Sequence, residues 1–85
     1  SEAVEDTNQA LDPTHQQILL ALLRRESVAL ALKTDHLMPS MVADTINRAF
    51  LDEIGDNVLE CDGDTITLVE DYRDDLLEIL GVVNQ

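Results

Sequence analysis

The chain is 85 residues long and carries 18 acidic residues against five Lys and Arg, a formal net charge of −13. Apolar residues make up 45% of it, enough for one small core, but only 2% of the residues are aromatic. A surface this acidic repels the phosphates of nucleic acids and attracts cations or basic proteins. Composition and charge therefore exclude a nucleic-acid-binding role and favour a cation or a basic protein as partner.

The chain carries one cysteine, Cys61, so an intrachain disulfide is impossible, which favours a reducing compartment. No apolar run approaches the roughly 20 residues that span a bilayer, and the acidic N-terminus lacks the apolar segment of a signal peptide. We therefore expect a cytoplasmic protein that does not enter membranes. Residues 1–10 are polar, acidic and aperiodic, and predict a flexible tail or linker before one ordered domain at residues 11–82.

Two helices are predicted in the first part of this domain. The first runs from Asp12 or Pro13 to Glu26, because aspartate caps helices and proline suits the first helical position. The second covers residues 28 to about 35, with Ser27 as its cap.

The third predicted helix, Met41 to Ile54, has the clearest periodicity, since its apolar residues repeat at three and four positions. Pro39 precedes it, Ser40 is its predicted cap, and Gly55 ends it as a left-handed cap. In a winged-helix protein the third helix would be the recognition helix. Here it carries one arginine among several acids, which again argues against DNA.

After this helix the apolar period changes from about 3.6 to two. Residues 57–61 and 65–69 read as strands around the segment Asp62-Gly63-Asp64, and an Asp-Gly pair favours the tight turn of a hairpin. A final helix is predicted from residue 70 or 71 to Leu80. The order of three helices, a β-hairpin and a C-terminal helix predicts a small single α+β domain of winged-helix-like arrangement.

Seven apolar side chains are expected to be mostly buried. They are Leu19, Leu22, Val42, Ile46, Phe50, Leu76 and Leu80. Met38 and Met41 either cover this core, the reading we favour, or form an exposed apolar patch. Asn47 follows the core position Ile46 and either anchors the hairpin or the first helix, or is solvated.

The histidines and the cysteine do not predict a metal site. His15 and His36 flank different helices and Cys61 lies on a strand, without the spacing of metal ligands. We expect surface histidines and a small, buried or half-buried cysteine. No nucleophile elbow, phosphate loop or zinc-protease motif is present, so the sequence predicts no enzyme.

Acidic residues around the hairpin form the best-defined candidate site for a cation. Glu60, Asp62 and Asp64 alternate, so their side chains can share one face of the ribbon or its tip. Calcium and magnesium prefer several oxygen ligands. The predicted ligands are Asp56, Glu60, Asp62, Asp64, Asp71 and Asp75. The alternative is a solvated acidic surface with helix-capping acids.

An EF-hand calcium loop is excluded at this position. Counted from Asp62, the fifth position is Ile66 and the twelfth is Arg73, where the loop requires oxygen ligands.

Several segments resemble TerB-C, the C-terminal module of TerB-type tellurite-resistance proteins, over roughly residues 11–80. They are Leu37-Met38-Pro39, Ala43-Asp44-Thr45-Ile46-Asn47-Arg48-Ala49-Phe50, Gly55-Asp56-Asn57-Val58-Leu59-Glu60, and the later Tyr72, Asp75 and Leu76. The sequence departs from the family where aromatics are frequent: these positions are Glu26 or Ser27, and Arg48.

The resemblance implies an accessory domain of a bacterial stress-response protein, whose acidic residues have been proposed to chelate metal, without an established activity. From charge and resemblance together we expect a non-enzymatic module that binds calcium or magnesium through clustered acids. The alternative is a protein–protein interaction module that presents an acidic face to a basic partner. Either way, the partner is a protein or another domain of the parent protein, and neither nucleic acid nor membrane.

Overall fold

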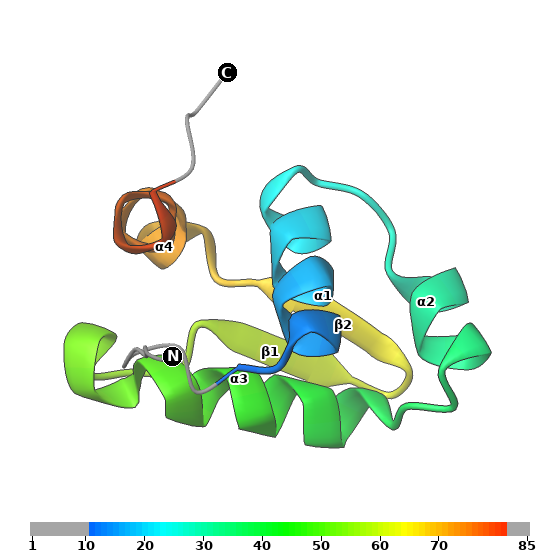
Figure 1. Ribbon diagram of the computed structural model, residues 1–85. Helices are drawn as coiled ribbons and strands as arrows, with labels where there is room; N and C mark the ends of the chain where they lie inside the picture. Colours follow the sequence, from blue (N-terminus) through cyan, green and yellow to red (C-terminus); the bar gives the residue numbers. More distant parts are fainter. Residues whose placement is uncertain (1–10, 82–85) are drawn as a thin grey trace.

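The computed structural model describes residues 11–81, and its elements follow the predicted order (Figure 1). They are α1 (Pro13–Leu23), α2 (Ala29–Thr34), α3 (Pro39–Ile54), β1 (Leu59–Asp62), β2 (Thr65–Leu68), the one-turn 3₁₀ helix η2 (Glu70–Tyr72) and α4 (Arg73–Leu80). The predicted α+β class is confirmed. The tail predicted at residues 1–10 lies outside the described residues.

Helix α3 is the longest element and starts earlier than predicted. It begins at Pro39 rather than Met41, because a proline at the first helical position loses no hydrogen bond. The predicted cap Ser40 therefore lies inside the helix, and Met38 takes the N-cap position without a side-chain bond. The predicted left-handed cap Gly55 is confirmed, with φ of 83°. The buried stripe of α3 consists of Val42, Ala43, Ile46 and Phe50.

The first two helices are shorter than predicted. Helix α1 ends at Leu23 and not at Glu26, since Arg25 adopts the left-handed region with φ of 63° and turns the chain away. Val28, and not the predicted Ser27, takes the N-cap position of α2, although the Ser27 hydroxyl accepts a hydrogen bond of 3.3 Å from the backbone N–H of Ala29. The single turn after the hairpin is 3₁₀ rather than α, and α4 starts only at Arg73.

The two strands form an antiparallel hairpin, as predicted, although each strand has only four residues. Asp62 belongs to β1 and pairs with Thr65, so the connecting loop contains only Gly63 and Asp64. Gly63 has φ of 62° and Asp64 does not have a positive φ, which is the pattern of a type II′ turn. A side chain at Gly63 would strain this turn.

Six of the seven predicted core residues are buried: Leu19, Leu22, Val42, Ile46, Phe50 and Leu76. Leu80 is partly buried and packs against the core at the last turn of α4, where Leu77 is fully buried. The favoured reading of Met38 and Met41 is wrong: they are 64% and 62% exposed. Cys61, expected to be buried or half-buried, is exposed because it lies near the hairpin tip, beyond the core.

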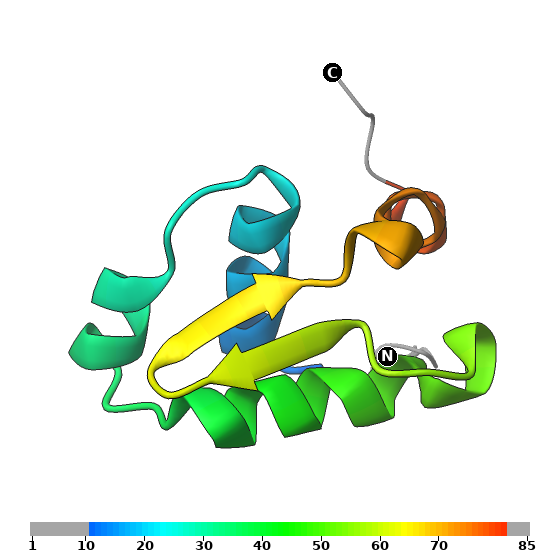
Figure 2. The same ribbon diagram turned by 180° about the vertical axis from the view of Figure 1, so that it is seen from behind.

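The hairpin packs one face on the core and leaves the other open. On the inner face, Leu59 and Ile66 are buried. On the outer face, Glu60, Asp62, Thr65 and Thr67 are exposed. In Figure 2 the hairpin lies in front of α1, with β1 running beside α3 and no helix over the face toward the viewer. The candidate site is built on this open side.

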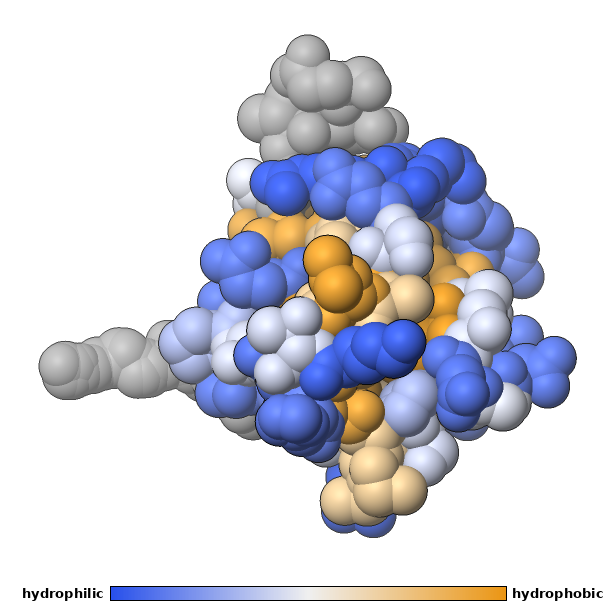
Figure 3. All heavy atoms as spheres, turned by 90° about the vertical axis from the view of Figure 1, so that its right-hand side faces the viewer, coloured by the Kyte–Doolittle hydropathy of each residue, from blue (hydrophilic) through white to orange (hydrophobic). Residues whose placement is uncertain are grey.

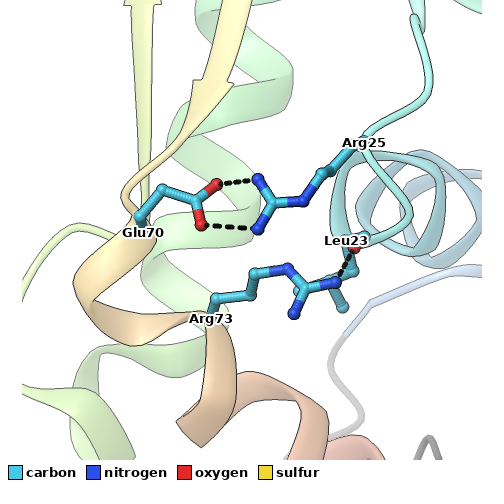
Figure 4. A network of polar contacts seen from close by, with 4 residues as sticks. All are labelled: Leu23, Arg25, Glu70 and Arg73. Carbon is cyan, nitrogen blue, oxygen red and sulfur yellow. Dashed lines mark hydrogen bonds and ion pairs between the residues drawn. The ribbon is translucent and has the colours of Figure 1, made fainter. Parts of the chain in front are cut away.

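The end of α1 and the start of α4 meet through two arginines (Figure 4). Arg25 donates two hydrogen bonds to the carboxylate of Glu70, at 3.0 and 3.2 Å. Arg73 donates one to the backbone carbonyl of Leu23, at 2.6 Å. These contacts connect segments that lie far apart in the sequence.

Candidate functional site

The side chain of Asn47 fixes the hairpin to α3. Its Oδ1 accepts hydrogen bonds from the backbone N–H groups of Val58 and Leu59, at 2.9 and 2.8 Å, and its Nδ2 donates one to the Leu59 carbonyl at 3.1 Å. A side-chain amide offers a donor and an acceptor like a peptide group. Asn47 therefore pairs with Leu59 much as a neighbouring strand would, and the predicted anchoring role is confirmed.

Beside this anchor lies a hollow of about 760 Å³ between α3 and the hairpin, which we call the α3–β1 groove. One wall comes from α3: Ser40, Ala43, Asp44 and Asn47. The other wall comes from the hairpin and the residue before it: Asn57, Leu59, Glu60, Cys61, Asp62, Thr65 and Thr67. The four α3 residues are three, four and seven positions apart, so they share one helix face.

Three carboxylates line the groove: Asp44 from α3, and Glu60 and Asp62 from β1. Glu60 and Asp62 are two positions apart on a strand, so they project to the same side of the hairpin. Asp44 forms an exposed ion pair of 3.1 Å with Arg48, and neither lysine nor arginine is among the lining residues. The groove is therefore open, polar and negatively charged.

The structure separates the predicted cation ligands into two groups. Glu60, Asp62 and Asp64 lie on the hairpin and its turn, whereas Asp71 belongs to η2 and Asp75 to the first turn of α4. Within residues 11–81, no group of three or more His, Cys, Asp or Glu side chains is close enough to hold a metal ion. Cation binding by these residues in solution stays a prediction.

Asp56, the sixth predicted ligand, is part of a local hydrogen-bond network. It accepts a hydrogen bond of 2.9 Å from the Tyr72 hydroxyl and one of 2.7 Å from the backbone N–H of Asn57. The Tyr72 bond and then the Asn57 bond stabilise the carboxylate and lower the pKa of Asp56. The same hydrogen bond to Asp56 raises the pKa of Tyr72. Asp56 thus ties the loop after α3 to η2.

Both histidines were expected on the surface, but only one of them is exposed. His15 is half-buried and bonds the carboxylate of Asp12 through Nδ1, and the bond lowers the pKa of Asp12. Asp12 occupies the predicted N-cap position of α1, but its side chain makes no cap bond to the helix backbone. His36 is exposed. Cys61 donates a hydrogen bond of 3.3 Å from Sγ to the carbonyl of Gly63.

Sequence reasoning missed two residues of the groove, Asp44 and Cys61. The sequence did not predict Asp44 as part of the site, because Asp44 lines the same groove as Glu60 and Asp62 only when β1 packs against α3. A signal was present, since Asp44 lies one helical turn before Asn47, the residue that was expected to contact the hairpin. Cys61 was expected to be buried or half-buried, whereas it is exposed and lines the groove.

A second surface feature is apolar and lies near the start of α3. Leu30 on α2 is 75% exposed, close in sequence to the exposed Met38 and Met41. Figure 3 shows the side of the molecule that α2 occupies, where orange and pale orange patches are interrupted by blue side chains. Exposed apolar side chains of this kind are common where proteins meet.

The fold and the acidic groove define a small α+β domain. The chain belongs to the TerB-C domain family, whose model matches residues 1–77. The resemblance seen in the sequence is thereby confirmed, and the chain is an accessory domain related to tellurite resistance. No curated protein and no solved structure matches the chain. Within residues 11–81, no helix combines the length and apolarity needed to cross a membrane.

Proposed function

We propose that this domain is a non-catalytic interaction module of a bacterial stress-response protein, and that it binds a basic protein partner through its acidic surface. One observation carries the proposal. The fold brings carboxylates from α3 and β1 into one open groove with no lysine or arginine in its lining. A lysine- or arginine-rich partner would neutralise this charge and would be steered toward it over distance.

The charge of the rest of the domain supports the same partner. Residues 11–81 contain fifteen carboxylates, all exposed, against five Lys and Arg. Arg25 and Arg48 already pair with carboxylates, and Arg73 turns toward a backbone carbonyl. Most of the negative charge is therefore uncompensated within the domain, and it is available to a partner.

Catalysis plays no part in this proposal. The groove contains no histidine, and its one potential nucleophile, Cys61, bonds a backbone carbonyl rather than a base. We place the interaction in the cytoplasm, where a single exposed cysteine stays reduced.

Binding of calcium or magnesium is the second candidate function, and one observation favours it. Glu60 and Asp62 project to the same side of β1, and Asp64 follows in the turn, so three carboxylates lie close in sequence at one end of the hairpin. A cation there would require rotation of these side chains and further ligands from water. The interaction module is preferred because it needs no rearrangement of the domain.

An NMR titration of the backbone amides separates the two functions. With a short lysine-rich peptide, we expect shifts concentrated on residues that line the α3–β1 groove. Calcium and magnesium should shift the amides no more than sodium at the same ionic strength, because screening alone acts on dispersed charges. Localised shifts at residues 60–64 with calcium, together with diffuse shifts with the peptide, would reject the interaction module in favour of the cation site.

A further inference from the structure

The outer edge of β1 carries backbone groups that the hairpin does not use. Val69 donates a backbone hydrogen bond of 2.8 Å to Val58, which fixes the hydrogen-bonded positions of the ladder. In an antiparallel pair, bonded and non-bonded positions alternate. By the observed register, Leu59 and Cys61 occupy non-bonded positions, so their N–H and C=O groups point away from β2.

Leu59 and Cys61 differ in the hydrogen-bond partners of these outward N–H and C=O groups. At Leu59, the amide of Asn47 binds both the N–H and the C=O. At Cys61, no partner for either group is found among residues 11–81, and the residue is exposed in the α3–β1 groove. An unpaired strand edge of this kind is a template for another strand.

We infer that the α3–β1 groove binds an extended, basic segment of the partner protein, which pairs through its backbone with Cys61 and continues the edge pairing that Asn47 begins at Leu59. This inference rests on the proposed function and specifies how the partner is held. The segment donates a hydrogen bond to the Cys61 carbonyl and accepts one from the Cys61 N–H.

Charge complementarity identifies the segment as basic. Glu60 and Asp62 lie on either side of Cys61 and project to the open face of the hairpin. Side chains of an added strand alternate with the same period of two, so its alternate residues would stand beside these carboxylates. Asp44 faces the segment from the α3 wall, where Ser40 and Ala43 contribute only short side chains.

The same charges argue against other occupants. A second copy of the domain would bring its own Glu60 and Asp62 against those of the first, and like charges opposite each other destabilise paired strands. A nucleic acid would bring phosphates to the same carboxylates. A basic protein segment is the occupant that satisfies both the backbone groups and the charges.

The test uses a short fluorescent peptide of alternating lysine and valine, with affinity measured by anisotropy. The groove variant carries Asp44→Asn, Glu60→Gln and Asp62→Asn. The matched control carries Asp35→Asn, Glu53→Gln and Glu78→Gln, three exposed acids outside the groove, and so has the same net charge. We expect the groove variant to bind roughly tenfold more weakly than the control, because it removes three charges that face the peptide, and each exposed charge pair contributes only modestly.

A second measurement isolates the backbone pairing. Hydrogen exchange of the Cys61 amide should slow when the peptide is bound, and a peptide with N-methylated valines should lose most of both the affinity and this protection. Equal affinities of groove variant and control, or an unprotected Cys61 amide in the complex, would overturn the inference while leaving a basic partner in place. Absence of peptide binding at low salt would overturn both the inference and the proposed function.

Discussion

The guanidinium of Arg73 donates a hydrogen bond of 2.6 Å to the backbone carbonyl of Leu23, the last residue of α1 (Figure 4). The bond joins the first residue of α4 to a helix 50 positions earlier in the chain. A charged donor at a helix C-terminus also meets the negative end of the helix dipole. The nearby pair of Arg25 and Glu70 is largely exposed, so solvent weakens it.

Because the Arg73 bond is part-buried and the Arg25–Glu70 pair is exposed, loss of the Arg73 bond should destabilise the domain more. Arg73→Ala should lower the free energy of unfolding by about 1.5–3 kcal/mol, because it removes a hydrogen bond from a charged donor to a part-buried carbonyl. Glu70→Gln should cost less than about 1 kcal/mol. Urea denaturation measures both. A larger loss for Glu70→Gln would make the exposed ion pair the main connection between the helices.

Asn47→Ala should destabilise the domain by about 1–3 kcal/mol, since it leaves backbone groups of Val58 and Leu59 without partners. The hairpin should also exchange its amide protons faster. Thr45→Ala, an exposed change on the same helix, should alter stability by no more than about 0.5 kcal/mol. Equal melting temperatures for the two variants would show that Asn47 is dispensable as an anchor.

Phe50 and Leu51 are neighbours on α3 with opposite surroundings, 1% and 50% exposed. Phe50→Ala should cost about 3–5 kcal/mol, because a cavity replaces the only phenylalanine of a small core. Leu51→Ala, the control on the same helix, should cost much less. Thermal denaturation followed by circular dichroism compares them. An unchanged melting temperature of the Phe50 variant would show that the Phe50 ring contributes little to the stability of the core.

The bond between Tyr72 and Asp56 predicts a defined pH dependence. The pKa of Asp56 is lower in the fold than its ordinary value of 3.8, so the stability this bond contributes is present above that value and lost as the pH falls through the folded pKa. The pKa of Tyr72 is raised above 10.0, so the contribution is also lost in strong alkali.

The wild-type chain should therefore be more stable than Tyr72→Phe across about pH 5–9, and the difference should vanish on acidification below the range where aspartates titrate. Denaturation midpoints of both proteins over pH give the difference directly, since general repulsion among the acids is common to the two. A difference that persists at low pH would mean that packing of Tyr72, rather than its hydroxyl, supplies the stability.

Duplex DNA should not bind the isolated domain at physiological salt, despite an element order that resembles winged-helix proteins. With a net charge of −13, the domain and the duplex repel each other. Anisotropy of a labelled duplex should stay flat, with a basic helix-turn-helix domain as the positive control. Binding that weakens steeply as salt is added would contradict this expectation.

The sequence predicted the parts of the fold that depend on local periodicity and special residues. The apolar stripe of α3, the left-handed cap at Gly55 and the tight turn at Gly63 were all correct. Helix ends were less accurate, because they depend on single backbone angles such as that of Arg25. Pro39 was expected to precede the third helix, whereas it is the first residue of that helix.

The candidate site was only partly predictable. Glu60 and Asp62 were recognised because alternation along a strand places them together. Their meeting with Asp44 depends on how β1 docks on α3, which no local pattern encodes. Asp71 and Asp75 belong to a separate group, since the 3₁₀ turn carries the chain away from the hairpin before α4 begins.

The open edge of β1 bears on how the domain behaves at high concentration. Unpaired edges invite edge-to-edge assembly, and natural proteins commonly guard them with charge. Here Glu60 and Asp62 flank the free backbone of Cys61, so neighbouring copies repel each other at neutral pH. The net negative charge of the domain falls as the pH approaches its isoelectric point of about 4.1, and the domain should then begin to self-associate. The residues that admit a basic segment would thus also keep the domain colloidally stable until that segment arrives.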